Sequence, residues 1–218
     1  MAIHAQERDA LPVTTRNTTK PSIEFWFEFA SNYSYLSVMR IEAAAAQHGV
    51  QVIWRPFLLG PIFKEFGWNS SPFVLQELKG DYVWKDMARQ CHKYGLPWRR
   101  PSNFPRSALL PIQVALLGAE QPWMSAYCQR MMLLNFAEDC ELESLELVVN
   151  VLQELGLPAQ ELITEAQSAT NKRHLRAQTD LAKVKGIFGA PTFFVNGEMF
   201  WGNDRLDDAL SACTEQCV

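Results

Sequence analysis

The sequence lacks the cysteine patterns that define disulfide exchange and zinc binding. No two cysteines have the C-x-x-C spacing, and the count is odd: Cys91, Cys128, Cys140, Cys213 and Cys217. Cys213 and Cys217 are four residues apart but have no histidine nearby to complete a zinc site, so we expect no bound metal. We interpret them as ordinary thiols, which fits a reducing, cytoplasmic location.

Long apolar segments and runs of one charge are also missing. No stretch reaches the ~18 apolar residues that a membrane helix needs, and residues 1–22 lack the apolar segment of a signal peptide. No run of Lys or Arg exceeds two residues, and the formal net charge is −4. We therefore expect no nucleic-acid or membrane partner, and a flexible N-terminal tail over 1–22.

The common nucleotide and hydrolase motifs are absent as well. There is no G-x-G-x-x-G, no P-loop and no G-x-S-x-G. What the sequence does have is ordinary globular composition: 218 residues, 48% of them hydrophobic and 20% charged. That length suits one domain with an insertion, or two small domains, with a sizeable core.

The first third of the chain predicts a strand, a helix and a second strand. "IEFWFEF", residues 23–29, is aromatic and β-branched, and Trp26 is apolar on the face opposite the phenylalanines, so this strand is buried on both sides. A helix follows, capped by Ser31 or Asn32, and "VQVIWRPF" (50–57) is the second strand. Short links between these elements favour a βαβ unit with parallel strands.

The middle of the chain is predicted to be helical, and the end returns to β structure. The predicted helices of the middle are 73–94, 105–118, 122–138, 144–155, 158–168 and 170–185. Near the end, "PTFFV" and "EMFW" are strands joined by a type I′ turn at Asn196 and Gly197, and a final helix follows. A thioredoxin fold has this order without the helical block. We therefore predict an α/β thioredoxin-like domain, 23–72 and 187–218, with an all-helical insertion, 73–186.

Ser31 lies where the first strand ends and the first helix begins, in the four residues Ser31-Asn32-Tyr33-Ser34. A thioredoxin-like chain would carry its Cys-x-x-Cys there. Ligands of open α/β sheets bind at such strand ends, and a hydroxyl at a helix start can donate to an anion. No neighbouring His makes this serine a nucleophile. Taken alone, the residue is better explained as a helix cap.

Two further stretches could hold a ligand. Ala190-Pro191 begins a strand; a cis bond there would turn the backbone of Ala190 outward, although few X–Pro bonds are cis. Asn203 can cap the last helix, and Asp204 in its first turn could accept from an α-ammonium group. Singly, a trans proline and simple capping explain both. "RRPSNFPR" (99–106) and Lys64 could each bind a carboxylate, or lie in solvent.

Three stretches together resemble the 2-hydroxychromene-2-carboxylate isomerase family, which is close to the kappa-class glutathione transferases and the DsbA-type proteins. They are "FWFEFASNYSYL", "RPFLLGPIFKEFGWNSSPF" and "GIFGAPTFFVNGEMFWGNDRL". The resemblance runs over roughly 22–212. The family often has S-P-Y-S where this chain has Asn32 in place of the proline, and D-F where it has Glu28-Phe29.

The resemblance implies a homodimer that binds glutathione. The family's motif serine, Ser31 here, holds the glutathione sulfur as a thiolate, and Ala190 before Pro191 pairs with the glutathione cysteine through its backbone. The implied contacts of the γ-glutamyl end are Trp201, Gly202, Asn203 and Asp204. Further implied cofactor contacts are Lys64, Asn69 and Phe73. The implied substrate contacts are Asn103, Phe104 and Arg106.

The resemblance also implies the reaction. Glutathione thiolate would add reversibly to 2-hydroxychromene-2-carboxylate, or to a related aromatic-degradation metabolite, and allow cis–trans isomerisation to the trans-benzylidenepyruvate. Lys64 or Arg106 would meet the carboxylate of this small aromatic substrate. The alternatives are a kappa-like transferase that conjugates electrophiles, and a binding module without turnover. A disulfide oxidoreductase is disfavoured, since the cysteine pair is missing.

Overall fold

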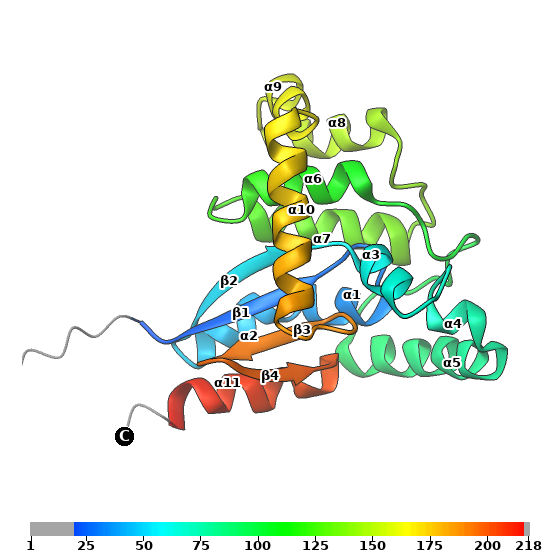
Figure 1. Ribbon diagram of the computed structural model, residues 1–218, viewed down its shortest axis with the longest axis vertical. Helices are drawn as coiled ribbons and strands as arrows, with labels where there is room; N and C mark the ends of the chain where they lie inside the picture. The colour runs from blue at the N-terminus through cyan, green and yellow to red at the C-terminus, as the bar shows by residue number, and fades with distance from the viewer. Residues whose placement is uncertain (1–19, 216–218) are drawn as a thin grey trace, which may run out of the picture.

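A four-stranded mixed sheet forms the centre of the protein in a computed structural model that describes residues 20–215. Its strands are β1 (Ser22–Phe27), β2 (Gln51–Pro56), β3 (Thr192–Val195) and β4 (Glu198–Trp201), in the order β2-β1-β3-β4 (Figure 1). β1 and β2 are parallel, whereas β3 is antiparallel to both β1 and β4. The predicted parallel pair and C-terminal hairpin are thus confirmed.

Both faces of β1 are covered, as its apolar composition predicts. Phe25 and Phe27 stack at 5.2 Å and belong to the larger core, whereas Trp26 points to a second cluster with Phe57 and Phe194. α3 and α10 cover the Trp26 face, and α2 and α11 pack on the other side of the sheet. Because all three aromatic side chains are fully buried, β1 holds a fixed position from which its carboxyl end presents the following turn.

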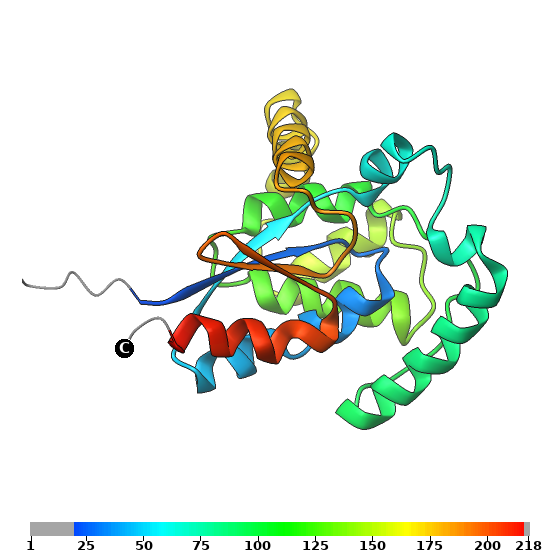
Figure 2. The ribbon, with the colours of Figure 1, turned by 60° about the horizontal axis from the view of Figure 1, so that its bottom comes forward.

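The helices account for most of the remaining chain. Around the sheet lie α1 (Asn32–Val38), α2 (Ile41–Gln47), α3 (Leu59–Glu65), the short 3₁₀ helix η1 (Asn203–Arg205) and α11 (Leu206–Glu215). The middle of the chain forms α4 (Pro72–Leu75), α5 (Glu77–Tyr94), α6 (Leu109–Gly118), α7 (Met124–Phe136), α8 (Leu145–Glu154), α9 (Ala159–Ala166) and α10 (Ala169–Val184). Figure 2 shows α5 lying apart from the sheet. Residues 73–186 contain no strand in the structure, as predicted.

Three predicted helices differ from the structure. The first helix is broken at Met39 and Arg40 into α1 and α2; Arg40 has a φ of −118°, and its guanidinium lies 3.8 Å from the ring centre of Tyr94. The predicted helix 73–94 is α4 and α5, separated by the non-helical Gln76 (φ −118°, ψ 87°). The predicted helix 105–118 begins only at Leu109, since the preceding residues form a loop at the pocket.

The sheet and the helical middle share one continuous core. Phe29, after β1, packs edge-on against Tyr127 of α7 at 6.1 Å, and Tyr35 of α1 stacks on Phe136 at 5.5 Å. The predicted division into 23–72 with 187–218 and an insertion 73–186 describes the order of the elements along the chain. That the two parts are separate domains stays a prediction. The predicted tail lies outside the described residues except at its end.

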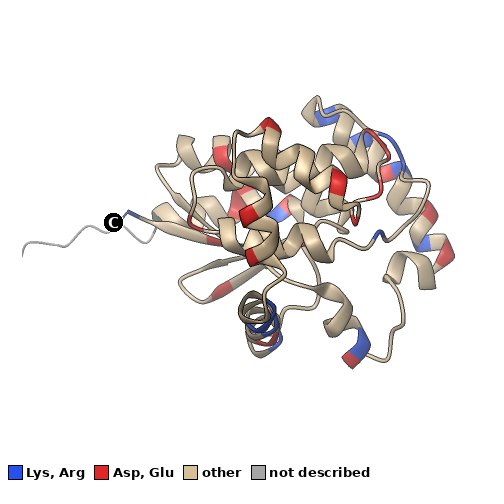
Figure 3. Cartoon of the chain, turned by 90° about the horizontal axis from the view of Figure 1, so that it is seen from above, with Lys and Arg blue, Asp and Glu red and all other residues tan. Residues whose placement is uncertain are grey.

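The prediction of no membrane or nucleic-acid partner rests on the negative net charge and on the lack of basic runs and long apolar segments. Figure 3 shows acidic and basic residues spread over the helices. Among residues 20–215 no helix is both long and apolar enough to cross a bilayer. Cys91 and Cys128 are buried free thiols, and burial raises the pKa of both; Cys217 lies outside the described residues.

Candidate active site

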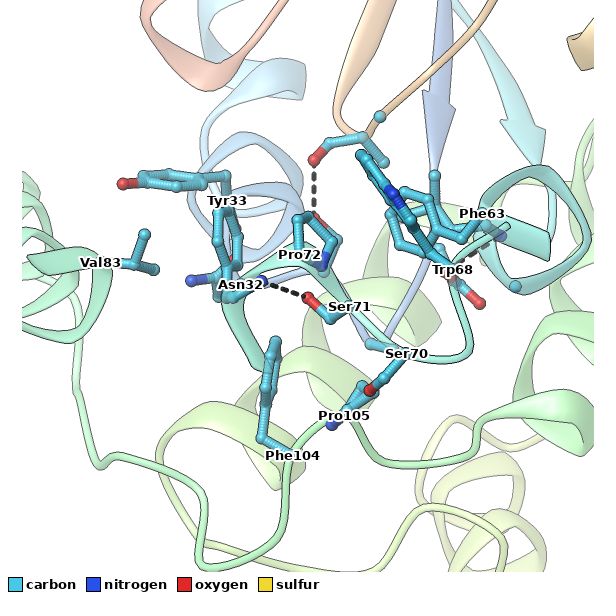
Figure 4. A pocket seen from close by; sticks show the side chains of 18 of the residues that line it. Asn32, Tyr33, Phe63, Trp68, Ser70, Ser71, Pro72, Val83, Phe104 and Pro105 are labelled. Carbon is cyan, nitrogen blue, oxygen red and sulfur yellow. Dashed lines mark hydrogen bonds between the residues drawn. The ribbon is translucent and has the colours of Figure 1, made fainter. Parts of the chain in front are cut away.

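A pocket of about 1030 Å³ lies at the carboxyl end of β1, and segments far apart in sequence close around it. It is bounded by the turn at 28–33, by α3, by α4 with the start of α5, and by the loops at 104–107, 188–191 and 201–202. Figure 4 shows Tyr33 and Val83 on one side and Phe63 and Trp68 on the other, with Phe104 at the edge. This is the strand-end position where open α/β sheets bind ligands.

Ser31 lies in this pocket and caps α1. Its Oγ accepts from the N–H of Ser34 at 3.2 Å and donates to the carbonyl oxygen of Ala190 at 2.7 Å. The residue is 8% exposed, and its own N–H donates to the carbonyl of Glu28 at 3.2 Å. The cap interpretation is therefore correct, and the hydroxyl is also held at the pocket, against the loop that precedes β3.

The loop before β3 brings Ala190 and Pro191 to the same place. Their peptide bond is cis, and the carbonyl of Pro191 accepts from the N–H of Gly202 at 3.0 Å. The amide N–H of Ala190 has no acceptor within residues 20–215, so it is available to a ligand backbone. Gly189 allows the indole of Trp201 to lie close to this loop, because a Cβ there would lie 2.5 Å from the indole nitrogen.

Eight aromatic side chains line the pocket. Phe188 meets Trp201 edge-on at 4.8 Å, Phe63 lies 5.6 Å from Trp68, and Tyr33 lies 6.2 Å from Phe73. On the far side Phe104 packs at 4.7 Å against Trp84, which lies outside the pocket. Such walls suit a flat, apolar molecule, because aromatic rings pack well edge to face or stacked.

Two lysines supply positive charge. Lys64 of α3 and Lys79 of α5 line the pocket, and neither forms an ion pair with another described residue. Lys79 lies 6.0 Å from the ring centre of Phe73. An anionic ligand can therefore meet a cation from either helix without first breaking a salt bridge.

Arg106 borders the pocket but is committed elsewhere. It is 2% exposed; Nε donates to Glu141 at 3.1 Å, Nη1 to the backbone and side-chain oxygens of Asn135 at 3.1 Å, and Nη2 to Asp139 and to Ser102. Hydrogen bonds from Ser102 and this arginine hold the pKa of Asp139 well below its usual range. The proposed contact with a substrate carboxylate is therefore not supported by its geometry.

Asn203, Asp204 and Asn103 do not line this pocket. Asn203 does not cap α11; it is buried inside η1, and its Oδ1 accepts from Ser37 and Arg40, each at 3.1 Å. Asp204 is exposed and pairs with Arg205 at 3.3 Å, but its Oδ1 lies beside Gly202 at the border of the pocket. Asn103 lines a smaller neighbouring hollow. The other expected residues are brought together: Ser31, Lys64, Asn69, Phe73, Phe104, Arg106, Ala190, Pro191, Trp201 and Gly202.

Glu28 was not expected in the site. It lines the pocket three residues before Ser31, and its Oε2 accepts from the N–H of Leu59, the first residue of α3, at 3.2 Å. Burial raises the pKa of its carboxyl to about 7, although the Leu59 N–H opposes this by favouring the charged form. The sequence does place the Glu28 carboxyl directly after a buried strand, but only the fold shows that it lines the pocket.

Comparison with known proteins agrees with this geometry. Residues 22–213 match the model of the DSBA-like thioredoxin domain. The 2-hydroxychromene-2-carboxylate isomerase of Pseudomonas putida is 30% identical over 198 residues, 89% of this chain and 95% of that protein. A glutathione S-transferase kappa 2 of Caenorhabditis elegans is 24% identical, covering 88% of this chain and 92% of its own.

The same relation is seen in three dimensions. A solved structure of a 2-hydroxychromene-2-carboxylate isomerase superposes with a TM-score of 0.80 at 26% identity, over 90% of this chain and 96% of that one. The match extends through the helical middle as well as the sheet. The chain therefore belongs to the DSBA-like thioredoxin domain family and, within it, to the 2-hydroxychromene-2-carboxylate isomerases.

Proposed function

We propose that this protein is a glutathione-dependent isomerase that converts 2-hydroxychromene-2-carboxylate, or a related aromatic carboxylate, to its trans-benzylidenepyruvate. The observation that carries the proposal is the pocket itself, where Ser31 and the Ala190 backbone face aromatic walls and two unpaired lysines. The isomerase names of the relatives support the reaction, and the kappa transferase names support the cofactor.

The residues present fit glutathione. The free N–H of Ala190 suits the peptide backbone of the cofactor, and Ser31 is placed to donate to its sulfur once the hydroxyl turns from the Ala190 carbonyl. Trp201 and Gly202, with Lys64 and Asn69, border the same space. The cavity volume accommodates a tripeptide together with a small aromatic molecule.

When bound, glutathione supplies a thiolate that adds to an electron-poor carbon of the substrate and later leaves it. Ser31 stabilises negative charge on the sulfur, which lowers the pKa of a thiol. Phe104, Tyr33 and Phe73 confine the ring. Lys64 or Lys79 meets the carboxylate, in place of the Arg106 expected from the sequence. The walls exclude water while the carbon chain rotates.

Isothermal titration of reduced glutathione tests the cofactor. Ser31→Ala removes both the cap and the donor, so it is compared with Ser144→Ala, which removes a similar cap from α8 outside the pocket. Each change is expected to cost roughly 0.5–2 kcal/mol of stability. Wild type and Ser144→Ala should bind glutathione alike, whereas Ser31→Ala should bind it more weakly and lose most turnover. Equal binding and turnover in all three proteins would contradict the proposal.

A kappa-like transferase is the second candidate, favoured by the kappa relatives. Product analysis with a chromene carboxylate separates the two activities. An isomerase returns glutathione and yields an isomer of the substrate, whereas a transferase consumes glutathione and yields a thioether. Binding of glutathione with neither product would favour the binding module.

We also propose a cytoplasmic homodimer, as the family resemblance implies. A soluble mass of twice the single chain in sedimentation is expected, and a mass of one chain at micromolar concentration would contradict it. Cytoplasmic thiols stay reduced, which keeps both glutathione and the free cysteines in their reduced forms.

A further inference from the structure

Glu28 stands out among the groups that the proposed mechanism leaves unused. Its backbone and that of Ser31 are joined by a hydrogen bond, and both side chains line the pocket. Oε2 is occupied by the Leu59 N–H, but Oε1 has no hydrogen-bond partner among the described residues and is not among the buried unpaired atoms. One carboxylate oxygen thus fixes the side chain, and the other is available to a ligand or water.

No other group in the pocket can exchange a proton as easily near neutral pH. Its other titratable side chains are two lysines, two tyrosines and an arginine: Lys64 on α3, Tyr33 on α1, Lys79 and Tyr82 on α5, and Arg106 in the loop. These residue types ordinarily keep their protons at pH 7. Burial, with a hydrogen bond to Asp86, moves the pKa of Tyr33 further upward. No histidine lines the pocket.

The surroundings of Glu28 add no ion pair. α3, whose first residue donates to Glu28, also carries Lys64 and Glu65. Glu65 pairs with Lys183 of α10 at 2.7 Å, and no charged side chain contributes to the shift in the pKa of Glu28. Burial raises the pKa of Glu28, because it disfavours the charged carboxylate. A second negative charge close by would disfavour the charged form further.

We propose that Glu28 is the proton acceptor of this site, taking the proton of the glutathione thiol as the thiolate forms. This rests on the proposed use of glutathione. The S–H bond breaks, its electron pair stays on sulfur, and an O–H bond forms on the Glu28 carboxylate, directly or through one water. When the thiolate leaves the product as free thiol, the proton returns from Glu28 to sulfur. The pocket therefore holds one negative charge rather than two.

The number of protons released on binding tests this role, and it is measured by titrating glutathione in buffers of different ionisation enthalpy. At pH 8 the free wild type holds an ionised Glu28, so the thiol proton stays in the protein and about none is released. Glu28→Gln keeps an acceptor for the Leu59 N–H but cannot take a proton. It should release about one proton per glutathione, while the ultraviolet absorbance of the bound thiolate is unchanged.

Glu24→Gln is the matched control. Glu24 is a carboxylate of β1, the strand that Glu28 follows, but it pairs with Lys185 at 3.0 Å and does not line the pocket. Its variant should behave like wild type. Equal proton release and equal thiolate absorbance in wild type and Glu28→Gln would overturn the role of Glu28 while leaving the proposed function standing. Absence of glutathione binding by wild type would overturn the proposed function, and this role with it.

Wild type alone provides a second test that no folding defect can obscure. At pH 6 Glu28 is already protonated in the free protein, so the thiol proton must go to solvent. Proton release should fall from about one at pH 6 to about none at pH 8. A release that is constant over this range would overturn the proposal.

Discussion

Asn32 carries an unpaired buried donor at the start of α1. The residue is 1% exposed, its Oδ1 accepts from the N–H of Tyr33 at 3.0 Å, and its Nδ2 has no partner among the described residues. A buried donor without an acceptor costs roughly 1–3 kcal/mol. This chain keeps such a group where the related family often has a proline, so the site is less stable locally than it could be.

Asn32→Pro is expected to stabilise the protein. Asn32 is the first residue of α1, a position that favours proline, and Ser31 before it has an extended backbone (φ −82°, ψ 116°) that a following proline requires. Loss of the unpaired donor outweighs loss of the Tyr33 hydrogen bond, for a net gain of about 1 kcal/mol. The melting temperature should rise by roughly 2–4 °C. A lower melting temperature would show that Nδ2 has a partner in solution.

Glu28 should make stability depend on pH in a predictable direction. Because folding raises its pKa from 4.5 to about 7, the folded state prefers the protonated carboxyl. Its contribution is complete below pH 4.5, is lost as pH rises to 7, and stays lost above; the total is at most about 3 kcal/mol. Glu28→Gln avoids this loss. Urea unfolding should show the variant more stable than wild type at pH 8, and the difference should shrink at pH 5. An equal difference at both values would contradict the shift.

Single residues also show where sequence reasoning stops. Ser31 could be placed at a helix start after a buried strand from local sequence, but its role beyond a cap was assigned through the family resemblance. Arg106 and Asn203 could not be assigned, because their partners are far away in sequence: Glu141 and Asn135 for the first, Ser37 and Arg40 for the second. Their polar side chains look available in a sequence, whereas the fold has already paired them.

At the scale of elements, the position of α4 against α5 sets one wall of the pocket. Gly80 of α5 lies under α4, and a Cβ there would come within 2.2 Å of the carbonyl oxygen of Phe73. Ser71 caps α4 by accepting from the Phe73 N–H at 3.3 Å, and both residues line the pocket. The two helices can therefore approach this closely only with glycine at residue 80.

Gly80→Ala should push α4 away from α5 and open the pocket wall. Overpacking of this kind costs typically 1–3 kcal/mol, more than the helix propensity gained from alanine. Glutathione affinity, measured by titration, should fall at least about tenfold. Gly60→Ala in α3 is the comparison: this residue also lines the pocket, but a Cβ there meets nothing within 4 Å, so it adds a methyl group without displacing a helix. If both variants bind as wild type does, the α4–α5 contact does not shape the site.

Elements with their own end signals could be predicted from the sequence. The hairpin turn has positive φ at Asn196 and Gly197, and the helices end before left-handed glycines such as Gly95 and Gly156. α3 was not predicted, because "LGPIFKE" contains glycine and proline near its start. The N–H groups at its start are satisfied by tertiary partners: Thr179 accepts from Leu58 at 3.3 Å, and Glu28 accepts from Leu59. No local pattern reports such partners.

At the scale of the whole molecule, the sheet and the helical middle are joined through buried polar contacts as well as apolar ones. Asn135 of α7, 1% exposed, donates to the carbonyl of Phe29 at 2.9 Å and accepts from Arg106. Phe29 leads into the turn that holds Ser31, and Arg106 belongs to the loop opposite. The side-chain amide of Asn135 thus connects the two sides of the pocket. An inserted domain with a core of its own would not make such a connection.

This connection predicts that the protein unfolds in one step. Helices dominate the far-ultraviolet circular dichroism. Tryptophan fluorescence reports on Trp26 and Trp54 of the sheet once Trp84, Trp98 and Trp123 of the helical middle are replaced by phenylalanine. Both signals should give the same midpoint on heating. Glutathione at about 100 times its dissociation constant should stabilise the folded state by ~2.7 kcal/mol and raise both midpoints together. Asn135→Leu would leave the Phe29 carbonyl without its donor, so it should lower both midpoints together. If the helical signal were lost first while the fluorescence stayed native, the helical middle would be an independent domain, and the geometry of the pocket would depend on docking between two bodies rather than on one core.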